Sequence, residues 1–164
     1  MTRRRSGEPS KGDLRHTAIL DAAEQLLDTV GYEAMTVADV AAGASITRGA
    51  LYFYFGSKQE IVTALFARTV AVLQDKSRAA EADAAQGARS INTAMRRTED
   101  LWRDHGVVMR TAIDLAATVP ELDILWQQTA DIFIAAIAAS LEQMGVPAGR
   151  LPINPLPWPR RCAG

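Results

Sequence analysis

The chain has 164 residues, of which 48% are hydrophobic and 23% are charged, and its formal net charge is −1. This balance is ordinary for one globular domain, or a small head on a larger body, and it excludes a protein coated in positive potential. The single cysteine, Cys162, excludes an internal disulfide framework and a multi-cysteine metal site. No apolar run approaches the roughly 18 residues of a membrane span, and no secretory signal follows the N-terminal arginines. We therefore expect a cytoplasmic protein that uses no cofactor and does not contact a membrane.

Residues 1–12 are rich in Arg, Ser, Gly and Pro, so they are predicted to be a disordered basic arm. Five basic residues stand against two acidic ones within residues 1–16. Arg3, Arg4 and Arg5 suit an arm that lies near phosphate groups, although a solvated, disordered start explains the same composition.

The next part of the chain predicts an all-α fold, because alanine is abundant and no run of alternating β-branched residues occurs. Apolar residues at helical spacing run from Ile19 to Val30, and Gly31 supplies a stop signal. Thr36 then caps a second helix, with Asp39 three residues later to bond back to it.

A tight turn with two short helices around it is the most informative feature of the chain. Gly43-Ala44-Ser45 forms the turn, Thr47 caps the following helix, and Gly56 ends it. Two helices joined by a short turn that contains Gly form a helix-turn-helix, whose second helix enters the major groove of DNA. The outer face of this second helix carries Thr47, Arg48, Gly49, Tyr52 and Tyr54. Ser57-Lys58-Gln59-Glu60 is a capping box that begins a long helix, so residues 13–68 are predicted to be a DNA-binding domain.

Residues 69–150 predict a helical regulatory domain. One amphipathic helix stops at His105-Gly106, a shorter one follows, and Pro120 begins a long helix that is apolar on two sides. Such a helix is either buried or lines a cavity. Five large apolar residues are candidates for an effector pocket, although their spacing suits a simple core equally well: Trp102, Met109, Trp126, Phe133 and Ile137. Asp104 and His105 look like a dyad, but such a pair at a helix end is usually structural.

The stretch from Ile19 to Phe66 resembles the head of the TetR family, the tetracycline-repressor-like transcriptional regulators. The matching strings are ILDAAE from Ile19, GY from Gly31, MTVADVA from Met35 and GASITRGALYFYFGSKQEI from Gly43. The part around Phe53 looks most like the ethionamide-repressor branch. The resemblance is strong over about a third of the chain, and beyond it the order and lengths of the helices are similar.

This resemblance implies an all-helical, dimeric repressor with a small head that binds a palindromic operator of double-stranded DNA. A larger helical body would hold a small apolar effector. The resemblance also implies that Thr36 bonds a phosphate from the cap of its helix. Thr47, Arg48 and Gly49 would meet base edges, and the planar fork of Arg48 matches the O6 and N7 atoms of guanine.

The remaining contacts implied by the resemblance are made to the DNA backbone. Tyr52 and Tyr54 would reach phosphates through their hydroxyl groups, Lys58 would add a charged phosphate contact, and Phe53 would meet a sugar or a thymine methyl group. Each role has an alternative in the residues themselves: Thr36 and Ser57 are also explained as helix caps alone, and Tyr52 and Phe53 as core aromatics.

The chain departs from the family after residue 150, where full-length relatives continue with two helices that pair across the dimer. Residues 151–164 are instead predicted to be an irregular tail rich in Pro and Arg, produced by a shifted reading frame or a misplaced stop. A second hypothesis is therefore a truncated fragment that does not dimerise, binds DNA weakly, or pairs with a related chain and inactivates it. An enzyme is not expected, because the sequence lacks the G-x-S-x-G, H-E-x-x-H, P-loop and dinucleotide-binding motifs.

Overall fold

A computed structural model describes residues 10–81, 87–143 and 145 of the chain. These residues form seven helices: α1 (Lys11–Thr29), α2 (Gly31–Ala34), α3 (Val37–Gly43), α4 (Arg48–Tyr52), α5 (Lys58–Glu81), α6 (Gly87–Ala116) and α7 (Pro120–Gln143). They contain no strand, which confirms the predicted all-α fold. None of these helices is both long and apolar enough to cross a membrane. Residues 1–9 of the predicted arm and the whole predicted tail lie outside the described residues.

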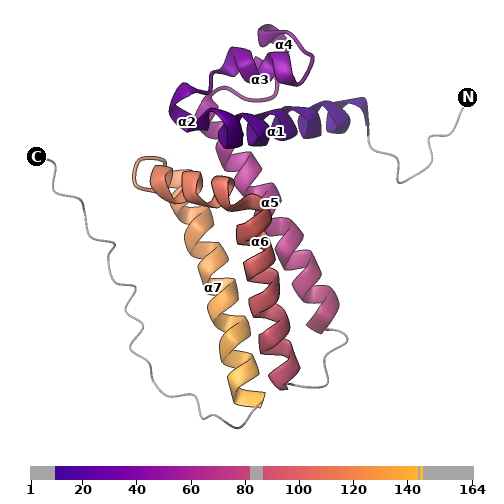
Figure 1. Cartoon of the computed structure of the whole chain (residues 1–164), viewed down its shortest axis with the longest axis vertical. Helices are drawn as coiled ribbons and strands as arrows, with labels where there is room; N and C mark the ends of the chain where they lie inside the picture. The colour runs from indigo at the N-terminus through magenta and orange to yellow at the C-terminus, as the bar shows by residue number, and fades with distance from the viewer. Residues whose placement is uncertain (1–9, 82–86, 144, 146–164) are drawn as a thin grey trace, which may run out of the picture.

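Helices α1–α4 gather at one end of the molecule, and the three long helices α5–α7 extend away from them (Figure 1). We call α1–α4 the head and α5–α7 the body. α5 leaves the head and packs against both α6 and α7. The buried residues form one continuous cluster that reaches from Ile19 in α1, through Leu51 in α4 and Phe66 in α5, to Leu122 in α7. A shared core therefore couples the position of the head to the body.

The head begins slightly earlier than the sequence predicts. α1 starts at Lys11 and not at Asp13, because Ser10 and Asp13 form a capping box. The backbone N–H of Ser10 donates to the Asp13 carboxylate (2.8 Å), and the backbone N–H of Asp13 donates to the Ser10 hydroxyl (3.1 Å). Gly31 follows the end of α1 with a positive φ of 78°, as a stop signal suggests, but it also begins the four-residue helix α2, which was not predicted.

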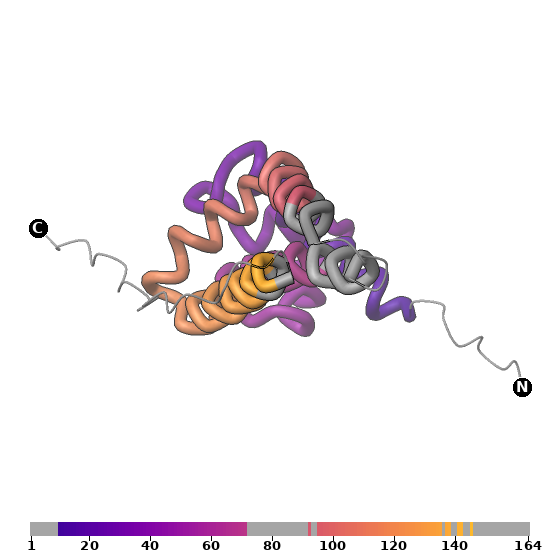
Figure 2. Tube along the Cα trace, turned by 90° about the horizontal axis from the view of Figure 1, so that it is seen from below, coloured from indigo at the N-terminus to yellow at the C-terminus, as the bar shows by residue number. Residues whose placement is uncertain are grey.

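α6 contains a sharp bend where the sequence predicts a break between two helices. His105 has non-helical angles (φ −127°, ψ 23°) inside the otherwise helical Gly87–Ala116 segment. The part of α6 after His105 turns away from the part before it, as both views show (Figures 1 and 2). α7 then begins at Pro120 as predicted, since a proline in the first turn has no N–H that needs a helical partner.

Three helices meet at the Glu24 carboxylate, where the head joins the body. Arg68 of α5 donates to Glu24 (Nη2–Oε2, 2.9 Å) and to Asp21 (Nη1–Oδ1, 2.6 Å), both on α1. The Nδ1 atom of His105 lies 2.5 Å from the other Glu24 oxygen. Asp104 pairs with Arg103 and not with His105, so the two residues do not form a dyad, and His105 has the structural role that the sequence favours. The bend of α6 is tied directly to the first helix of the head.

Candidate nucleic-acid interface

The turn between α3 and α4 depends on one left-handed residue and one close helix contact. Ser45 adopts the left-handed conformation (φ 56°), and the backbone N–H of Ile46 donates to the Ala41 carbonyl (2.9 Å). Gly43, which the sequence places in the turn, is the last residue of α3. A Cβ atom added to Gly43 would lie 2.9 Å from the Cβ of Ala22, so the absence of a side chain lets α3 approach α1 closely.

The predicted caps of the two short helices are present. The hydroxyl of Thr36 accepts from the backbone N–H of Asp39 (3.2 Å), and the Asp39 carboxylate accepts from the backbone N–H of Thr36 (3.1 Å). The hydroxyl of Thr47 accepts from the backbone N–H of Ala50 (3.1 Å). α4 ends at Tyr52, however, and not near Gly56 as predicted. These bonds satisfy backbone N–H groups in the first turn of α3 and of α4.

The outer side of α4 is exposed while one inner residue anchors it. Leu51 is fully buried, whereas Thr47, Arg48 and Gly49 are exposed. Tyr52 is 44% exposed and Phe53 is 87% exposed, so the alternative that these two rings are core aromatics is wrong. The Phe53 side chain is therefore available for contact with a partner.

Not all of the side chains predicted to contact DNA lie on this exposed face. Tyr54 is half-buried and packs on the hydrophobic core, with its ring edge-on to Phe53 at a centroid distance of 5.7 Å. Arg48 extends along α4 towards Tyr52, and its Nη2 atom donates to the Tyr52 hydroxyl (3.0 Å). The exposed set is therefore Thr47, Arg48, Gly49, Tyr52 and Phe53.

Thr36 acts within the protein as a helix cap. Its hydroxyl donates to the Asp39 carboxylate (2.6 Å) in addition to accepting from the backbone of that residue. A phosphate bonded by this hydroxyl group would have to replace the carboxylate of Asp39 and would be repelled by its charge. The geometry therefore favours the capping role of Thr36 over the phosphate contact that the resemblance implies.

Lys58 is held by the protein at the start of α5. Its Nζ atom donates to the Tyr32 carbonyl (2.8 Å) and lies 4.0 Å from the centre of the Tyr32 ring. Burial, and to a smaller extent the charge of Glu33, raise the pKa of Tyr32, so this ring remains neutral beside the ammonium group. Lys58 thus links α2 to α5, a contact that no local sequence pattern indicates because the two residues are far apart in the chain.

The predicted capping box before α5 is half correct. The backbone N–H of Glu60 donates to the Ser57 hydroxyl (3.1 Å), as predicted. The Glu60 carboxylate, however, accepts from the backbone N–H of Gly56 (2.8 Å) instead of that of Ser57. Ser57 therefore has the capping role that the sequence predicts.

A hollow of about 250 Å³ lies between α6 and α7 in the body. Four of the five predicted pocket residues line it, namely Trp102, Met109, Trp126 and Phe133, together with Thr98, Leu101, Thr129, Ala130 and Ile134. Ile137 does not line this hollow and is 49% exposed. No charged side chain lines it, and the Thr129 hydroxyl donates to the Leu125 carbonyl (2.7 Å). The hollow therefore suits an uncharged, apolar molecule.

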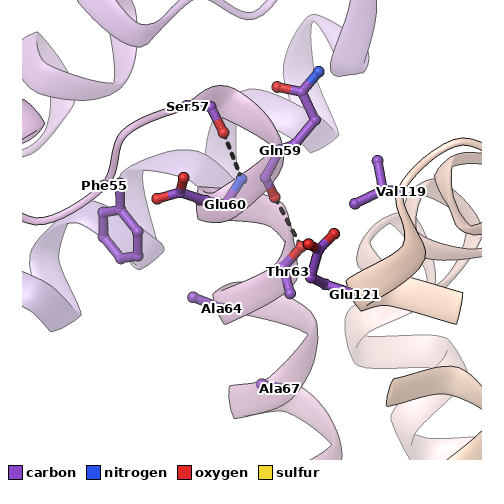
Figure 3. Close-up of a pocket in the computed structure, with 9 residues that line it drawn as sticks. All are labelled: Phe55, Ser57, Gln59, Glu60, Thr63, Ala64, Ala67, Val119 and Glu121. Carbon is purple, nitrogen blue, oxygen red and sulfur yellow. Dashed lines mark hydrogen bonds between the residues drawn. The ribbon is translucent and has the colours of Figure 1, made fainter. Parts of the chain in front are cut away.

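A larger open cleft of about 530 Å³ lies where the head meets α5 and the start of α7. Figure 3 shows side chains of α5 facing Val119, just before α7, and Glu121 of α7 across it. The sequence does not predict this cleft, because the two sides of the cleft come from distant parts of the chain. Among the described residues, no group of three or more His, Cys, Asp or Glu side chains is placed to hold a metal ion.

Comparison with known proteins relates the chain to bacterial regulators. Residues 19–65 match the family model described as bacterial regulatory proteins, tetR family. The HTH-type transcriptional regulator EthR of Mycolicibacterium smegmatis is 32% identical over 137 residues, which cover 83% of this chain and 63% of EthR. EthR of Mycobacterium tuberculosis is 33% identical over 150 residues, which cover 85% of this chain and 65% of that protein. The chain thus spans slightly less than two thirds of the length of these relatives.

Solved structures share the fold. The fatty acid degradation regulator FadR from Bacillus halodurans superposes with a TM-score of 0.69 at 19% identity, covering 85% of this chain and 72% of FadR. The ketosteroid transcriptional regulator KstR2 of Mycobacterium tuberculosis gives a TM-score of 0.67 at 23% identity, covering 85% of this chain and 71% of KstR2. Residues 19–65 therefore form a head of the TetR family of bacterial regulatory proteins, and the similarity to EthR extends along most of the chain.

Proposed function

We propose that the chain is a DNA-binding transcriptional repressor that binds a palindromic operator and releases it when a small apolar molecule enters the hollow. The observation that supports DNA binding most directly is α4, a capped helix with Leu51 buried and Arg48 exposed on its outer side. A guanidinium group at the start of a recognition helix can bond both acceptors of guanine in the major groove. The regulators to which the chain is similar are consistent with this function.

An operator selected from random DNA by the purified chain is expected to contain two inverted half-sites about one helical turn apart. The logarithm of the affinity should fall as the logarithm of the salt concentration rises, with a slope of about 0.9 for each phosphate that a Lys or Arg side chain neutralises. Arg48→Ala is expected to lower the ratio of operator affinity to random-duplex affinity about tenfold, since one bidentate base contact is worth about 1–3 kcal/mol.

Arg110→Ala is the matched control, because Arg110 is an exposed arginine of α6 in the body. It should bind both kinds of duplex as the unchanged chain does. Equal losses for Arg48→Ala and Arg110→Ala, or no operator in the selection, would count against the proposal. Mass measurement by light scattering decides between the homodimer that a palindrome requires and the alternative of a non-dimerising fragment.

The apolar lining of the hollow supports an uncharged effector. Trp102 and Trp126 both line it, so a bound molecule should change the tryptophan fluorescence of the protein. Neutral apolar compounds, from aromatic solvents to fatty acid esters and steroids, are expected to change this fluorescence and to release the operator in the same concentration range. Charged analogues of the same size should do neither, because a buried charge without a partner costs several kcal/mol. Release by charged and neutral compounds alike would contradict this part of the proposal.

A further inference from the structure

Arg48 and Tyr52 contact each other in two ways on the exposed side of α4. The Nη2 atom of Arg48 lies 3.0 Å from the Tyr52 hydroxyl oxygen, and its Cζ atom lies 5.4 Å from the centre of the Tyr52 ring. The two residues are four positions apart, which places their side chains together on one helix face. Tyr52 therefore provides both a hydrogen-bond acceptor and a ring surface for the guanidinium group of Arg48.

We propose that Tyr52 is a positioning residue that fixes the direction in which Arg48 presents its guanidinium group to a base pair. Tyr52 would then determine sequence specificity without touching a base. This inference rests on the proposed function, because it concerns the same DNA-binding face. It differs from the phosphate contact that the family resemblance implies for Tyr52, which carries no sequence information.

The hydrogen-bonding capacity of the two groups allows this arrangement to persist in a DNA complex. The Nη2 atom of arginine carries two hydrogens, one on each of the two donor edges that it shares with Nη1 and with Nε. Tyr52 accepts one of these hydrogens, so one edge of Arg48 keeps two parallel donors, as bidentate guanine recognition requires. The Tyr52 hydroxyl also keeps its own hydrogen, which remains free to be donated to a phosphate.

The charge of Arg48 also remains available. Within the described part of the chain, no carboxylate forms an ion pair with Arg48. Tyr52 orients the guanidinium group without neutralising it, whereas an acidic neighbour would oppose DNA binding. An exposed arginine loses much side-chain freedom when it binds, and an arginine that is already oriented loses less of it. The resulting gain in affinity should depend on the base pair that Arg48 contacts.

The test is Tyr52→Phe, which keeps the ring and removes only the oxygen atom. Affinity is measured by fluorescence anisotropy for the selected operator and for duplexes in which each base pair of the half-site is replaced in turn. Tyr52→Phe is expected to lower discrimination about fivefold at one base-pair position, the position at which Arg48→Ala also lowers it, and to leave the others unchanged. In the Arg48→Ala background, Tyr52→Phe should cause no further loss of discrimination.

Tyr54→Phe is the matched control, because no hydrogen bond joins its hydroxyl to Arg48. It is expected to change affinity by the same factor for every duplex. The inference is overturned if Tyr52→Phe weakens all duplexes by the same factor, since Tyr52 is then a backbone contact alone. Unchanged discrimination overturns it as well. Failure of the unchanged chain to bind any duplex overturns the proposed function itself, and this inference with it.

Discussion

Phe66→Ala is expected to lower the free energy of unfolding by about 3–5 kcal/mol, because it removes a large ring from the centre of the core. Phe66 lies on α5 and is 0% exposed, and its ring centre is 5.8 Å from that of Trp126 on α7. The helices around the missing ring can close the space only in part. The lost burial and the remaining cavity therefore both contribute, and urea unfolding followed by circular dichroism measures their sum.

Phe53→Ala is the matched control for this prediction. The same atoms are removed, but Phe53 is 87% exposed, so the free energy of unfolding should change by no more than about 0.5 kcal/mol. The variant at Phe66 has a second expected property. Benzene should restore part of its stability by occupying the new cavity, which adjoins the ring of Trp126 in the wall of the hollow. Similar losses for both variants would contradict the packing of α5 against α7.

The parts of the fold that follow from local chemistry could be predicted from the sequence. The caps at Thr36 and Thr47 and the helix start at Pro120 need only residues within one helical turn, and all three are present. The sequence also predicts a break between two helices at His105-Gly106, and the structure has a bend within α6 at this position. The early start of α1 was missed although Ser10 and Asp13 are also local, because a charged and polar segment was assigned to the arm.

The contacts between distant segments could not be predicted. Glu24 bonds to His105 across 81 positions of the chain, and Lys58 bonds to Tyr32 across 26. A sequence pattern identifies the faces of a helix, but it does not identify which polar side chains meet when two helices pack. The sequence therefore predicts a phosphate contact for Lys58, but it does not predict the contacts of Lys58 with the carbonyl group and the ring of Tyr32. The large apolar residues of α6 and α7 predict four of the residues that line the hollow. The same pattern also predicts Ile137, which does not line it.

The same limit applies to the candidate DNA-binding face. Residue type and spacing identified the exposed residues of α4 correctly as a group. They did not separate Tyr52, whose hydroxyl meets Arg48, from Tyr54, whose ring packs on the core. Two tyrosines in one short motif therefore have different surroundings. Residues of the candidate DNA-binding face and residues of the core alternate along this segment.

Gly43→Ala and Gly49→Ala are expected to change stability in opposite directions, although they make the same chemical change in neighbouring helices. A Cβ atom at Gly43 would lie 2.9 Å from the Cβ of Ala22, which is fixed to the backbone of α1 and cannot rotate away. α3 must then shift, at a cost of about 1–3 kcal/mol. At Gly49 nothing lies within 4 Å of the added atom, so alanine should stabilise α4 by about 0.5–1 kcal/mol.

The two variants also separate the stability of the head from its proposed contact with DNA. Gly43→Ala should reduce both the free energy of unfolding and the operator affinity, because a shift of α3 also moves α4 through their shared turn. Gly49→Ala should reduce operator affinity while the protein becomes more stable, because the new methyl group lies on the outer face that is proposed to meet the base pairs. Urea unfolding and fluorescence anisotropy on the same samples measure both quantities. A stabilised Gly49→Ala variant with unchanged operator affinity would mean that the backbone of α4 does not approach the bases closely at this position.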